Sequence, residues 1–418
     1  MDSASASSLA LIIVVAVLAP LAAEALRRFR IPGVVLEIAF GVVIGQQVLG
    51  LAELTPVVSG FGNLGLSFLM FLAGYEIDLD RIKGRPLDRA ARGWLLSLVA
   101  ALSVAGVLVV TGFALSDLLI GLCLTTTALG TLLPMLSDAG VLETRFGALV
   151  LAVGTVGEFL PIVAIALLLT SDNPGTTALL LVAFIALAVG ATLLATRARS
   201  PKVLALMRRH LDSSAQLPVR IAVLMVVALV WVAGHLGLDV LLGAFTAGII
   251  VRLFTAGEQA EVVGSKLSAL GFGFLIPIFF VVSGMKFDLD ALLSEPTTLL
   301  RVPLFLLLFL VARGLPAMVL YRRDLVRRDR AALAFFSATA LPLVVVITEI
   351  GLETERMLPE NAAALVGAGM VSVLVFPLAG FALHRSAATS EPSGGGVGAG
   401  DAEDAEDTGT DPASGLPV

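Results

Sequence analysis

Long apolar stretches alternate with short polar or Gly/Pro-rich loops along most of the chain. Many of these stretches reach about 20 residues, the length that an α-helix needs to cross the hydrocarbon core of a bilayer. Dividing the chain at the loops predicts about thirteen membrane-spanning helices. The predicted spans cover residues 8–26, 33–50, 60–77, 93–115, 117–136, 146–170, 176–196, 217–235, 237–253, 266–285, 302–320, 331–350 and 361–383.

The composition agrees with an all-α integral membrane protein. Of the 418 residues, 58% are hydrophobic and 14% are charged, whereas about a quarter of the residues in soluble domains are charged. The first span is not expected to be a cleaved signal, because residues 1–8 lack a basic region. Cys123 is the sole cysteine, so neither a disulfide framework nor a cysteine metal site is predicted. We expect no cofactor, no resident metal and no nucleic-acid partner.

The Lys and Arg residues gather in alternate loops. If the N-terminus lies outside the cell, the inward loops hold nearly all of the 27 basic residues, and the outward loops hold only Lys286, Arg301 and Arg356. Basic loops tend to remain in the cytoplasm. The distribution therefore predicts a multi-pass plasma-membrane protein with its N-terminus outside and its C-terminus inside.

The chain is expected to form a transmembrane domain, residues 1–384, followed by a cytoplasmic tail, residues 385–418. The tail is rich in Gly, Ser and Ala, and after Arg385 it has acidic residues without basic ones. This composition is typical of a disordered, solvated segment. The net charge of −6 therefore reflects the tail and not the membrane domain.

A weak internal repeat links the two halves of the membrane domain. Aligning Gly74 with Gly284 also aligns the Asp-Leu-Asp triplets that begin at Asp78 and Asp288. At a similar offset, "TTTALGTLLPMLSDAGVLE" resembles "SATALPLVVVITEIGLETE". The matched spans are the third with the tenth and the fifth with the twelfth. Since these are seven spans apart, the second copy enters the membrane from the opposite side.

Inverted repeats of this kind are typical of secondary transporters. The first repeat is expected at about residues 8–170 and the second at about residues 217–384. A linker helix at residues 176–196 would join them.

Two charged residues lie deep inside predicted spans. Glu158 is far from both ends of the sixth span, and Arg313 is similarly deep in the eleventh. A charge at the bilayer centre costs about 2.5–3.5 kcal/mol on insertion scales, so such groups usually pair with one another or line a wet cavity. The two residues therefore form either a structural ion pair or part of an ion pathway.

Four prolines are predicted to interrupt the helices near these charges. A proline lacks the N–H that would bond the carbonyl oxygen four residues earlier. Pro161 and Pro316 each stand three residues after a buried charge and free the carbonyl oxygen of the residue before it. Pro134 and Pro342 lie at similar positions in the matched spans. They are either ordinary kinks or marks of two interrupted helices, which bind small ions at the midplane of such transporters.

The other acidic residues of the spans are expected to serve at helix ends. Glu24, Glu37, Asp138 and Glu349 lie near predicted span ends and are interpreted as interfacial groups.

Four stretches together resemble the bacterial monovalent cation:proton antiporters, in the branch that contains potassium-efflux and Na+/H+ exchangers. They are "IPGVVLEIAFGVVIGQQVLG", "LMFLAGYEIDL", "LGAFTAGIIV" and "IPIFFVVSGMKFDLDAL". The resemblance covers about residues 8–384 and implies two inverted six-helix repeats with a crossed pair of broken helices. The crossed pair would fall on residues 125–136 and 338–350.

In that family the ion-carrying Asp usually follows Asn, Asp or Gln. The resemblance places Gly157 and Glu158 there, so this sequence departs at both positions. Arg313 falls where the family carries a Lys or Arg that pairs with the binding-site acid, which implies a charge-compensating role. A homodimer in the lipid bilayer is also expected.

The expected function is exchange of a monovalent cation, Na+ or K+, for H+ at Glu158 by alternating access. One titrating carboxylate favours electroneutral exchange, because Arg313 cannot give up its proton. Oxygen ligands for the cation are expected from Thr126, Thr127, the Gly157 carbonyl and Thr339.

Two alternatives remain open at this stage. The chain could be a passive cation channel, or a sodium-coupled organic-solute carrier of related fold, which a large apolar pocket beside the broken helices would favour. An intramembrane enzyme would need a second catalytic group near Glu158, and none is found in the sequence.

Overall fold

The computed structural model describes residues 3–26, 28, 31–77, 82, 84–168, 174–197, 215–255, 258–293 and 296–388. These residues form helices and loops, with no strand among them. The Asp78–Asp80 triplet, much of the loop before residue 215 and the tail beyond residue 388 lie outside the described residues.

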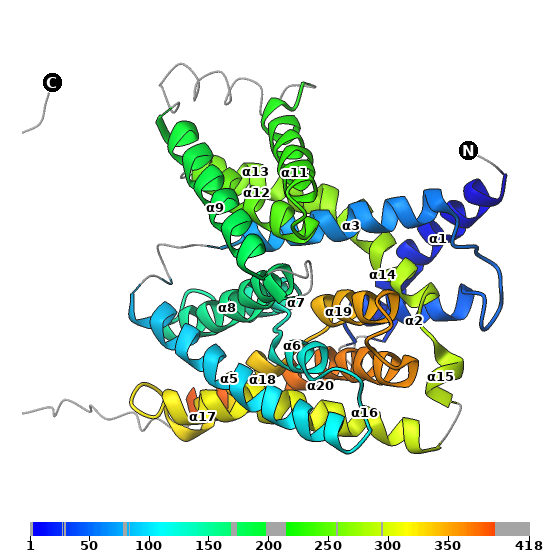
Figure 1. Ribbon diagram of the computed structural model, residues 1–418. Helices are drawn as coiled ribbons and strands as arrows, with labels where there is room; N and C mark the ends of the chain where they lie inside the picture. Colours follow the sequence, from blue (N-terminus) through cyan, green and yellow to red (C-terminus); the bar gives the residue numbers. More distant parts are fainter. Residues whose placement is uncertain are drawn as a thin grey trace, which may run out of the picture.

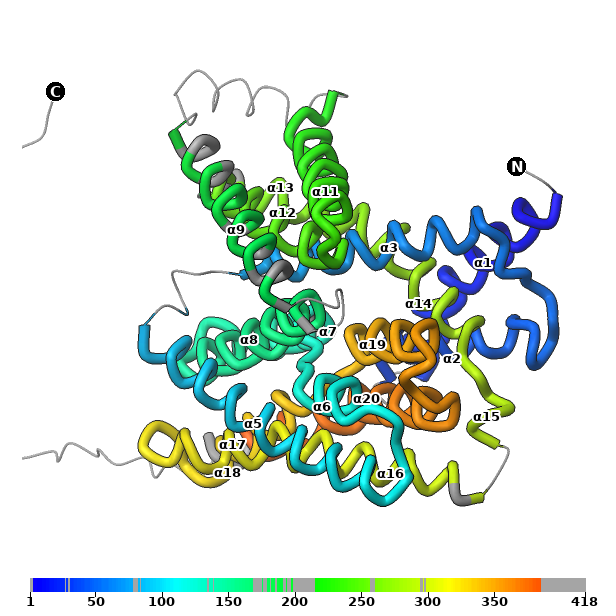
Figure 2. Tube along the Cα trace, in the orientation of Figure 1, coloured from blue at the N-terminus to red at the C-terminus, as the bar shows by residue number. Residues whose placement is uncertain are grey.

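Figures 1 and 2 show the arrangement of the helices. The first half contains α1 (Ser3–Ala25), α2 (Gly33–Ile44), α3 (Pro56–Tyr75), α5 (Arg85–Val110), α6 (Asp117–Thr125), α7 (Leu129–Asp138), α8 (Arg145–Leu168) and α9 (Pro174–Arg197). The second half contains α11 (Leu217–His235), α12 (Val240–Phe254), α13 (Glu258–Leu270), α14 (Ile276–Met285), α15 (Leu289–Leu293), α16 (Pro296–Phe309), α17 (Leu315–Leu320), α18 (Arg327–Ala338), α19 (Pro342–Glu353) and α20 (Pro359–Ala388). Two π-helical turns, Gly271–Leu275 and Leu310–Gly314, join α13 to α14 and α16 to α17.

Each of the thirteen predicted spans overlaps a helix or a pair of consecutive helices. Among the described residues, nine helical segments are both long and apolar enough to cross a membrane, and three shorter apolar ones accompany them. The all-helical membrane fold is therefore confirmed, while the count of thirteen crossings stays a prediction.

Side chains at the loop–helix boundaries determine where several helices begin. The hydroxyl of Thr55 accepts the Val58 N–H at 3.4 Å, and Pro56 fills the first position of α3, where its missing N–H costs nothing. The carboxylate of Asp239 accepts the Leu241 N–H at 2.8 Å at the start of α12. These caps satisfy amide groups that have no partner inside the helix.

The helices form two groups. The scaffold group contains α1–α3 and α11–α14, and the crossing group contains α5–α8 and α16–α20. In Figure 1 most of the scaffold group lies above or to the right of the crossing group, and α9 runs between them. Contacts between α3 and α7 and between α8 and α12 join the two groups.

Close helix contacts through glycine hold the scaffold group together. A Cβ at Gly74 on α3 would strike the Phe245 carbonyl oxygen on α12, and one at Gly248 on α12 would strike the Phe71 carbonyl oxygen on α3, so this contact joins the first repeat to the second. The two backbones therefore approach as closely as glycine allows, which is a common way of packing helices in lipid.

The contact between α2 and α14 is the counterpart of the α3–α12 contact, with the roles of the two repeats exchanged. A Cβ at Gly284 on α14 would strike the Ile38 carbonyl oxygen on α2, and one at Gly41 on α2 would strike the Val281 carbonyl oxygen on α14. Because Gly284 is the residue that the sequence aligns with Gly74, the weak repeat in the sequence corresponds to a repeated helix contact in space.

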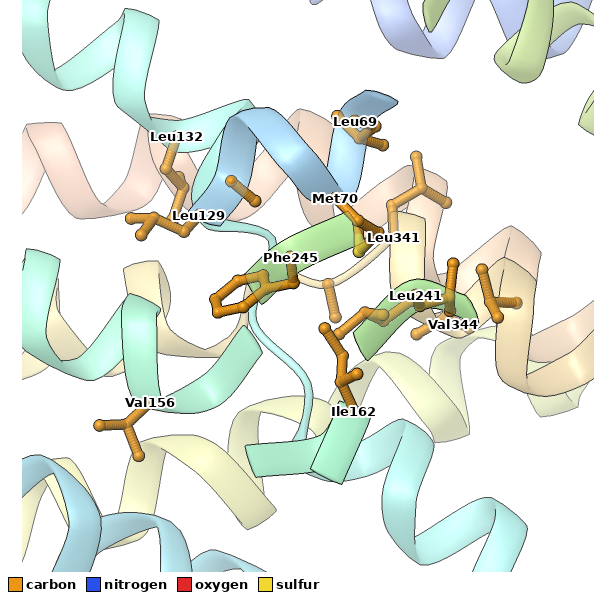
Figure 3. Packing of buried hydrophobic residues seen from close by; sticks show 14 of the residues in the cluster. Leu69, Met70, Leu129, Leu132, Val156, Ile162, Leu241, Phe245, Leu341 and Val344 are labelled. Atoms are coloured by element: carbon orange, nitrogen blue, oxygen red, sulfur yellow. The ribbon is translucent and has the colours of Figure 1, made fainter. Parts of the chain in front are cut away.

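Apolar side chains fill the region where the two groups meet (Figure 3). They come from α3, α7, α8, α12 and α19, and Phe245 stacks on Phe159 with ring centroids 5.2 Å apart. The labelled members of this cluster are Leu69, Met70, Leu129, Leu132, Val156, Ile162, Leu241, Phe245, Leu341 and Val344.

Candidate functional site

Two interrupted helices cross in the middle of the crossing group. The first break, residues 126–128, separates α6 from α7, and the second, residues 339–341, separates α18 from α19. The backbone at Thr126 and Thr339 is extended, and the Ala128 N–H donates to the Thr339 carbonyl oxygen at 2.7 Å. The crossed pair of broken helices is therefore present.

Threonine hydroxyls satisfy the helix ends at both breaks. Thr125 and Thr126 donate to the carbonyl oxygens of Leu122 and Cys123, each at 2.8 Å. Thr339 donates to the Phe335 carbonyl oxygen at 3.1 Å. These carbonyls lose their amide partners where a helix ends, and the hydroxyls replace them. The three hydroxyl oxygens retain lone pairs for a cation.

Two of the four prolines that were predicted to interrupt helices do not lie at a break. The first break precedes Pro134, and α7 continues through that residue. Pro161 likewise lies inside an uninterrupted α8. Neither proline interrupts its helix as predicted, because membrane helices tolerate proline when the freed backbone group finds another partner. The freed Gly157 carbonyl oxygen accepts the Thr127 N–H at 2.9 Å.

The two prolines of the second repeat do coincide with irregular backbone. Pro342 is the first residue of α19, directly after the break, where its missing N–H is not needed. Pro316 is the second residue of α17 and follows the π-helical turn Leu310–Gly314 that contains Arg313. The wider turn changes the direction of the chain without ending the helix.

Arg313 is 3% exposed and is solvated by neutral oxygens of the breaks. Its Nη2 and Nε donate to the Thr127 hydroxyl at 2.7 and 3.1 Å, and further bonds reach the carbonyl oxygens of Val153 and Ser337. The Thr127 hydroxyl in turn donates to the Ser337 carbonyl oxygen at 2.6 Å. Arg313 thus ties α8, the first break and α18 together.

The predicted pairing of Arg313 with Glu158 is not seen. No ion pair joins the two among the described residues, and the Oε2 atom of Glu158 is buried without a hydrogen-bond partner. The glutamate side chain is 2% exposed. A buried carboxylate in this position is costly unless it is neutralised.

Gly157 leaves room for the guanidinium group. A Cβ at this position would strike Nη2 of Arg313 and the Thr127 hydroxyl, and would lie 2.8 Å from the Thr127 Cβ. The absence of a side chain before Glu158, which departs from the pattern of the resembled family, is thus required by the position of Arg313.

The sequence analysis missed Glu76. It caps the C-terminal end of α3, its Oε2 atom is also buried without a partner, and it interacts electrostatically with Glu158. The available signal was the repeat itself, because the alignment of Gly74 with Gly284 places Glu76 opposite Lys286.

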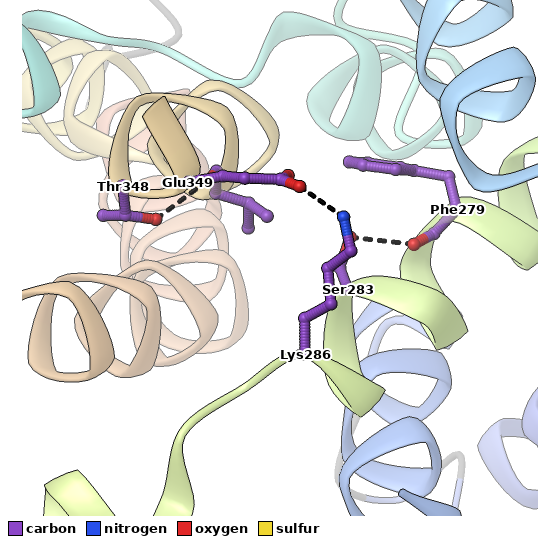
Figure 4. Close-up of polar contacts among 6 residues, drawn as sticks. Phe279, Ser283, Lys286, Thr348 and Glu349 are labelled. Carbon is purple, nitrogen blue, oxygen red and sulfur yellow. Dashed lines mark hydrogen bonds and ion pairs between the residues drawn. The ribbon is translucent and has the colours of Figure 1, made fainter. Parts of the chain in front are cut away.

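Lys286, at the end of α14, forms an ion pair with Glu349 on α19 (Figure 4). This contact connects the scaffold group to the crossing group at the rim of a cavity of about 160 Å³. The two side chains are 34% and 33% exposed. Glu349 is therefore a surface group near a helix end, as predicted.

Glu37 differs from that prediction. It is 8% exposed and lines a cavity of about 270 Å³ between the two helix groups. Its position near the end of a predicted span gave no sign that α3, α7 and α14 cover it.

Comparison with known proteins identifies the class. Residues 13–384 match the family described as sodium/hydrogen exchanger, transmembrane, and the chain belongs to this family. It is a multi-pass membrane protein.

Individual relatives are distant. The chain is 28% identical over 401 residues to the putative Na(+)/H(+) antiporter YjbQ of Bacillus subtilis, a match that covers 90% of this chain and 63% of the relative. It is 27% identical to the Na(+)/H(+) antiporter of Enterococcus hirae, over 63% of this chain and 68% of that one. The matched region spans 37% of cation/H(+) antiporter 19 of Arabidopsis thaliana.

The fold is similar to that of the sodium proton antiporter MjNhaP1 from Methanocaldococcus jannaschii. The TM-score is 0.63 at 18% identity, covering 91% of this chain and 96% of that one. At this identity the likeness concerns the fold alone.

Proposed function

We propose that this protein exchanges a monovalent cation, Na+ or K+, for protons across the cell membrane, with Glu158 as the shared binding site. The observation that carries the proposal is the buried, unpartnered Glu158 carboxylate beside two crossed helix breaks. Membership of the sodium/hydrogen exchanger family supports it.

The coupling follows from the cost of burying a charge. An ionised carboxylate that is 2% exposed is unfavourable unless a proton or a cation neutralises it. Both ligands need the same carboxylate, so occupancy by one excludes the other. If the empty site cannot switch between the two sides of the membrane, each turnover must carry one cation in one direction and one proton in the other.

Several oxygen atoms at the two helix breaks could bind a dehydrated cation. The hydroxyls of Thr126 and Thr339 use their hydrogens on nearby carbonyls, so their oxygens can face a cation. The Gly157 carbonyl keeps one lone pair beyond its bond from Thr127. We assign Thr127 mainly to holding Arg313, since its hydroxyl already accepts two bonds from the guanidinium.

Arg313 acts in this proposal as a fixed positive charge that holds the crossing, because arginine does not deprotonate in proteins. Glu76 adds a second carboxylate within electrostatic reach of Glu158. When both are ionised their repulsion strengthens the demand for a cation. Movement of the crossing group against the scaffold group would expose the site to each side in turn.

The topology with the N-terminus outside and the C-terminus inside, and the homodimer, remain predictions from the sequence and the resemblance. The organic-solute alternative receives little support. The cavity beside α7, about 270 Å³, is smaller than the roughly 300–1,000 Å³ of typical ligand pockets and contains a carboxylate.

The test uses the purified full-length protein in proteoliposomes with a pH-sensitive dye inside. Adding Na+, K+ or Li+ outside an acid-loaded vesicle should move protons in wild type, and Glu158→Gln should abolish this flux. Glu158→Asp, which keeps the carboxylate, should retain part of it. The exposed Glu53→Gln serves as the matched control.

Cation-driven proton flux that persists in Glu158→Gln would refute the proposal. Cation flux in wild type that does not respond to the pH gradient would indicate a channel instead.

A further inference from the structure

Ser372 on α20 holds the second helix break from outside it. Its hydroxyl oxygen accepts the Ala340 N–H at 3.0 Å. Its single hydrogen lies within bonding distance of two carbonyl oxygens, that of Ala340 at 2.9 Å and that of Gly369 at 2.7 Å. Ser372 is fully buried, and among the described residues no other side chain outside the break hydrogen-bonds residues 339–341. The Ala340 N–H therefore depends on this one hydroxyl.

Gly369 lies one turn before Ser372 and allows the break to approach α20. A Cβ at this position would lie 2.8 Å from the Ala340 carbonyl oxygen and 3.1 Å from Cδ1 of Leu341. The first of these distances is shorter than real Cβ contacts, so a methyl group there would displace the break. The hydrogen bonds of Ser372 and the small size of Gly369 thus act on the same stretch of backbone.

The first repeat holds its break in a different way. There the Gly157 carbonyl oxygen accepts an N–H of the break at 2.9 Å, and Glu158 follows directly. At the offset that separates the two breaks, Gly369 and Met370 take these two places in the second repeat. The second repeat therefore has no carboxylate at this place, and its break is held by the neutral hydroxyl of Ser372.

The hydroxyl of Ser372 fixes the peptide group between Thr339 and Ala340. In a planar trans peptide the C=O and N–H groups point in opposite directions. The Thr339 carbonyl oxygen of this group accepts the Ala128 N–H of the first break at 2.7 Å, and the Ala340 N–H on the other side donates to Ser372. The peptide group is therefore hydrogen-bonded on both sides. It cannot turn, or move relative to the first break, without losing one of these bonds.

We propose that Ser372 is a positioning residue of the cation site, which holds the oxygens of Thr339 where a cation at Glu158 can reach them. This inference rests on the proposed function. Without the Ser372 hydroxyl, the buried Ala340 N–H has no partner, and the break gains by moving towards another acceptor. A hard cation is bound by several oxygens in fixed places, whereas a proton needs only the carboxylate. Loss of the hydroxyl should therefore weaken cation binding and leave proton binding unchanged.

The test measures cation-driven proton flux in proteoliposomes of the purified full-length protein, with whichever of Na+ and K+ drives the flux in wild type. The cation concentration is varied at several pH values. Ser372→Ala should raise the KM for the cation about tenfold and change kcat by less than about twofold. Because proton binding is unchanged, the KM should rise by the same factor at each pH. Gly369→Ala, which displaces the same backbone, should also raise the KM.

Ser97→Ala and Gly367→Ala are the matched controls. Ser97 is also fully buried in the crossing group, but its hydroxyl donates to the Gly93 carbonyl oxygen of its own helix at 3.0 Å. A Cβ at Gly367 would lie 3.5 Å from Cγ2 of Val302, which is ordinary contact. Both control variants should keep the KM of wild type.

Amide hydrogen exchange over residues 336–345 provides a second measurement that does not depend on transport. Exchange in this segment should be faster in Ser372→Ala than in wild type or Ser97→Ala, because the break opens more readily. Unchanged exchange in Ser372→Ala, or a fall in kcat with an unchanged KM, would overturn the inference and leave the proposed function intact. A rise in KM that varies with pH would also overturn it, because the serine would then act on Glu158 itself. Flux that persists in Glu158→Gln would instead refute the proposed function, and this inference with it.

Discussion

The C-terminal ends of α3 and α14 occupy the same place in the two repeats, yet they carry opposite charges. Glu76 follows the end of α3, and Lys286 follows the end of α14 at the aligned position. Glu76 is left with a buried, unpartnered oxygen near Glu158, whereas Lys286 reaches across to Glu349. The backbone contacts around the two ends are nevertheless alike.

The two repeats therefore share their helix packing but differ in their charges. The glycine contacts are repeated because both halves must bring helices together in the same geometry. The charges are not repeated, because the unpartnered carboxylate oxygens of Glu76 and Glu158 both belong to the first repeat, whereas Lys286 of the second repeat is paired with Glu349. The first repeat thus contains two buried carboxylate oxygens without a partner, and the second contains a link between the helix groups.

The largest effect is expected when Glu76 of the first repeat is replaced by lysine, the residue type at the aligned position of the second repeat. In Glu76→Lys an ammonium group would stand near Glu158 and neutralise it without a transported ion. Cation-driven proton flux in proteoliposomes should fall by about 100-fold, which corresponds to about 2.7 kcal/mol. Glu76→Gln removes the charge without reversing it and should reduce flux less. Normal flux in Glu76→Lys would show that the two carboxylates are independent.

Gly157→Ala should have the next largest effect. Its Cβ would displace the Arg313 guanidinium and the Thr127 hydroxyl, and crowding of this kind costs about 1–3 kcal/mol. Thermal unfolding in detergent should show a lower midpoint, and ion flux should drop about tenfold. Gly367→Ala on α20 is the matched control, because the nearest atom to its Cβ would be Val302 Cγ2 at 3.5 Å. Equal effects at the two glycines would contradict this account.

The repeated glycine contacts can be compared directly. Gly248→Ala at the α3–α12 contact and Gly41→Ala at the α2–α14 contact should destabilise the protein by similar amounts, about 1–3 kcal/mol each, since both Cβ atoms would strike a facing carbonyl oxygen. Thermal unfolding of the single and double variants would measure this. A large difference between the single variants would mean that only one of the two contacts is tight in the membrane.

The smallest expected effect concerns the ion pair of the second repeat. Lys286→Glu should cost about 1 kcal/mol or less, because partly exposed ion pairs contribute about that much. The exchanged variant, Lys286→Glu with Glu349→Lys, should recover most of the loss in a thermal-unfolding cycle. If the exchange restores nothing, the two side chains are not coupled in solution.

Much of the fold could be predicted because it follows from hydropathy and a repeat. The spans are visible as apolar stretches, and two matched stretches that lie seven spans apart indicated inverted halves. The breaks were located less well. Proline was used as the signal, whereas the helices end where the hydroxyls of Thr125, Thr126 and Thr339 replace amide partners.

The partners of the buried charges were harder to predict. Arg313 has several donors, and the neutral oxygens that take them come from Thr127, Val153 and Ser337. These oxygens reach Arg313 only because the two broken helices cross. No pattern of neighbouring residues in the sequence indicates that contact. The burial of Glu37 depends in the same way on helices that are distant in the sequence.

The ion pair between Lys286 and Glu349 makes the molecule sensitive to its medium as well as to its substrate. Both side chains are about one third exposed, so dissolved ions can screen their attraction. The screening length falls from about 10 Å at 0.1 M salt to about 3 Å at 1 M. Rising ionic strength on that side of the membrane should therefore weaken the link between the scaffold group and the crossing group. Salt would then influence transport as an electrolyte, in addition to supplying the cation.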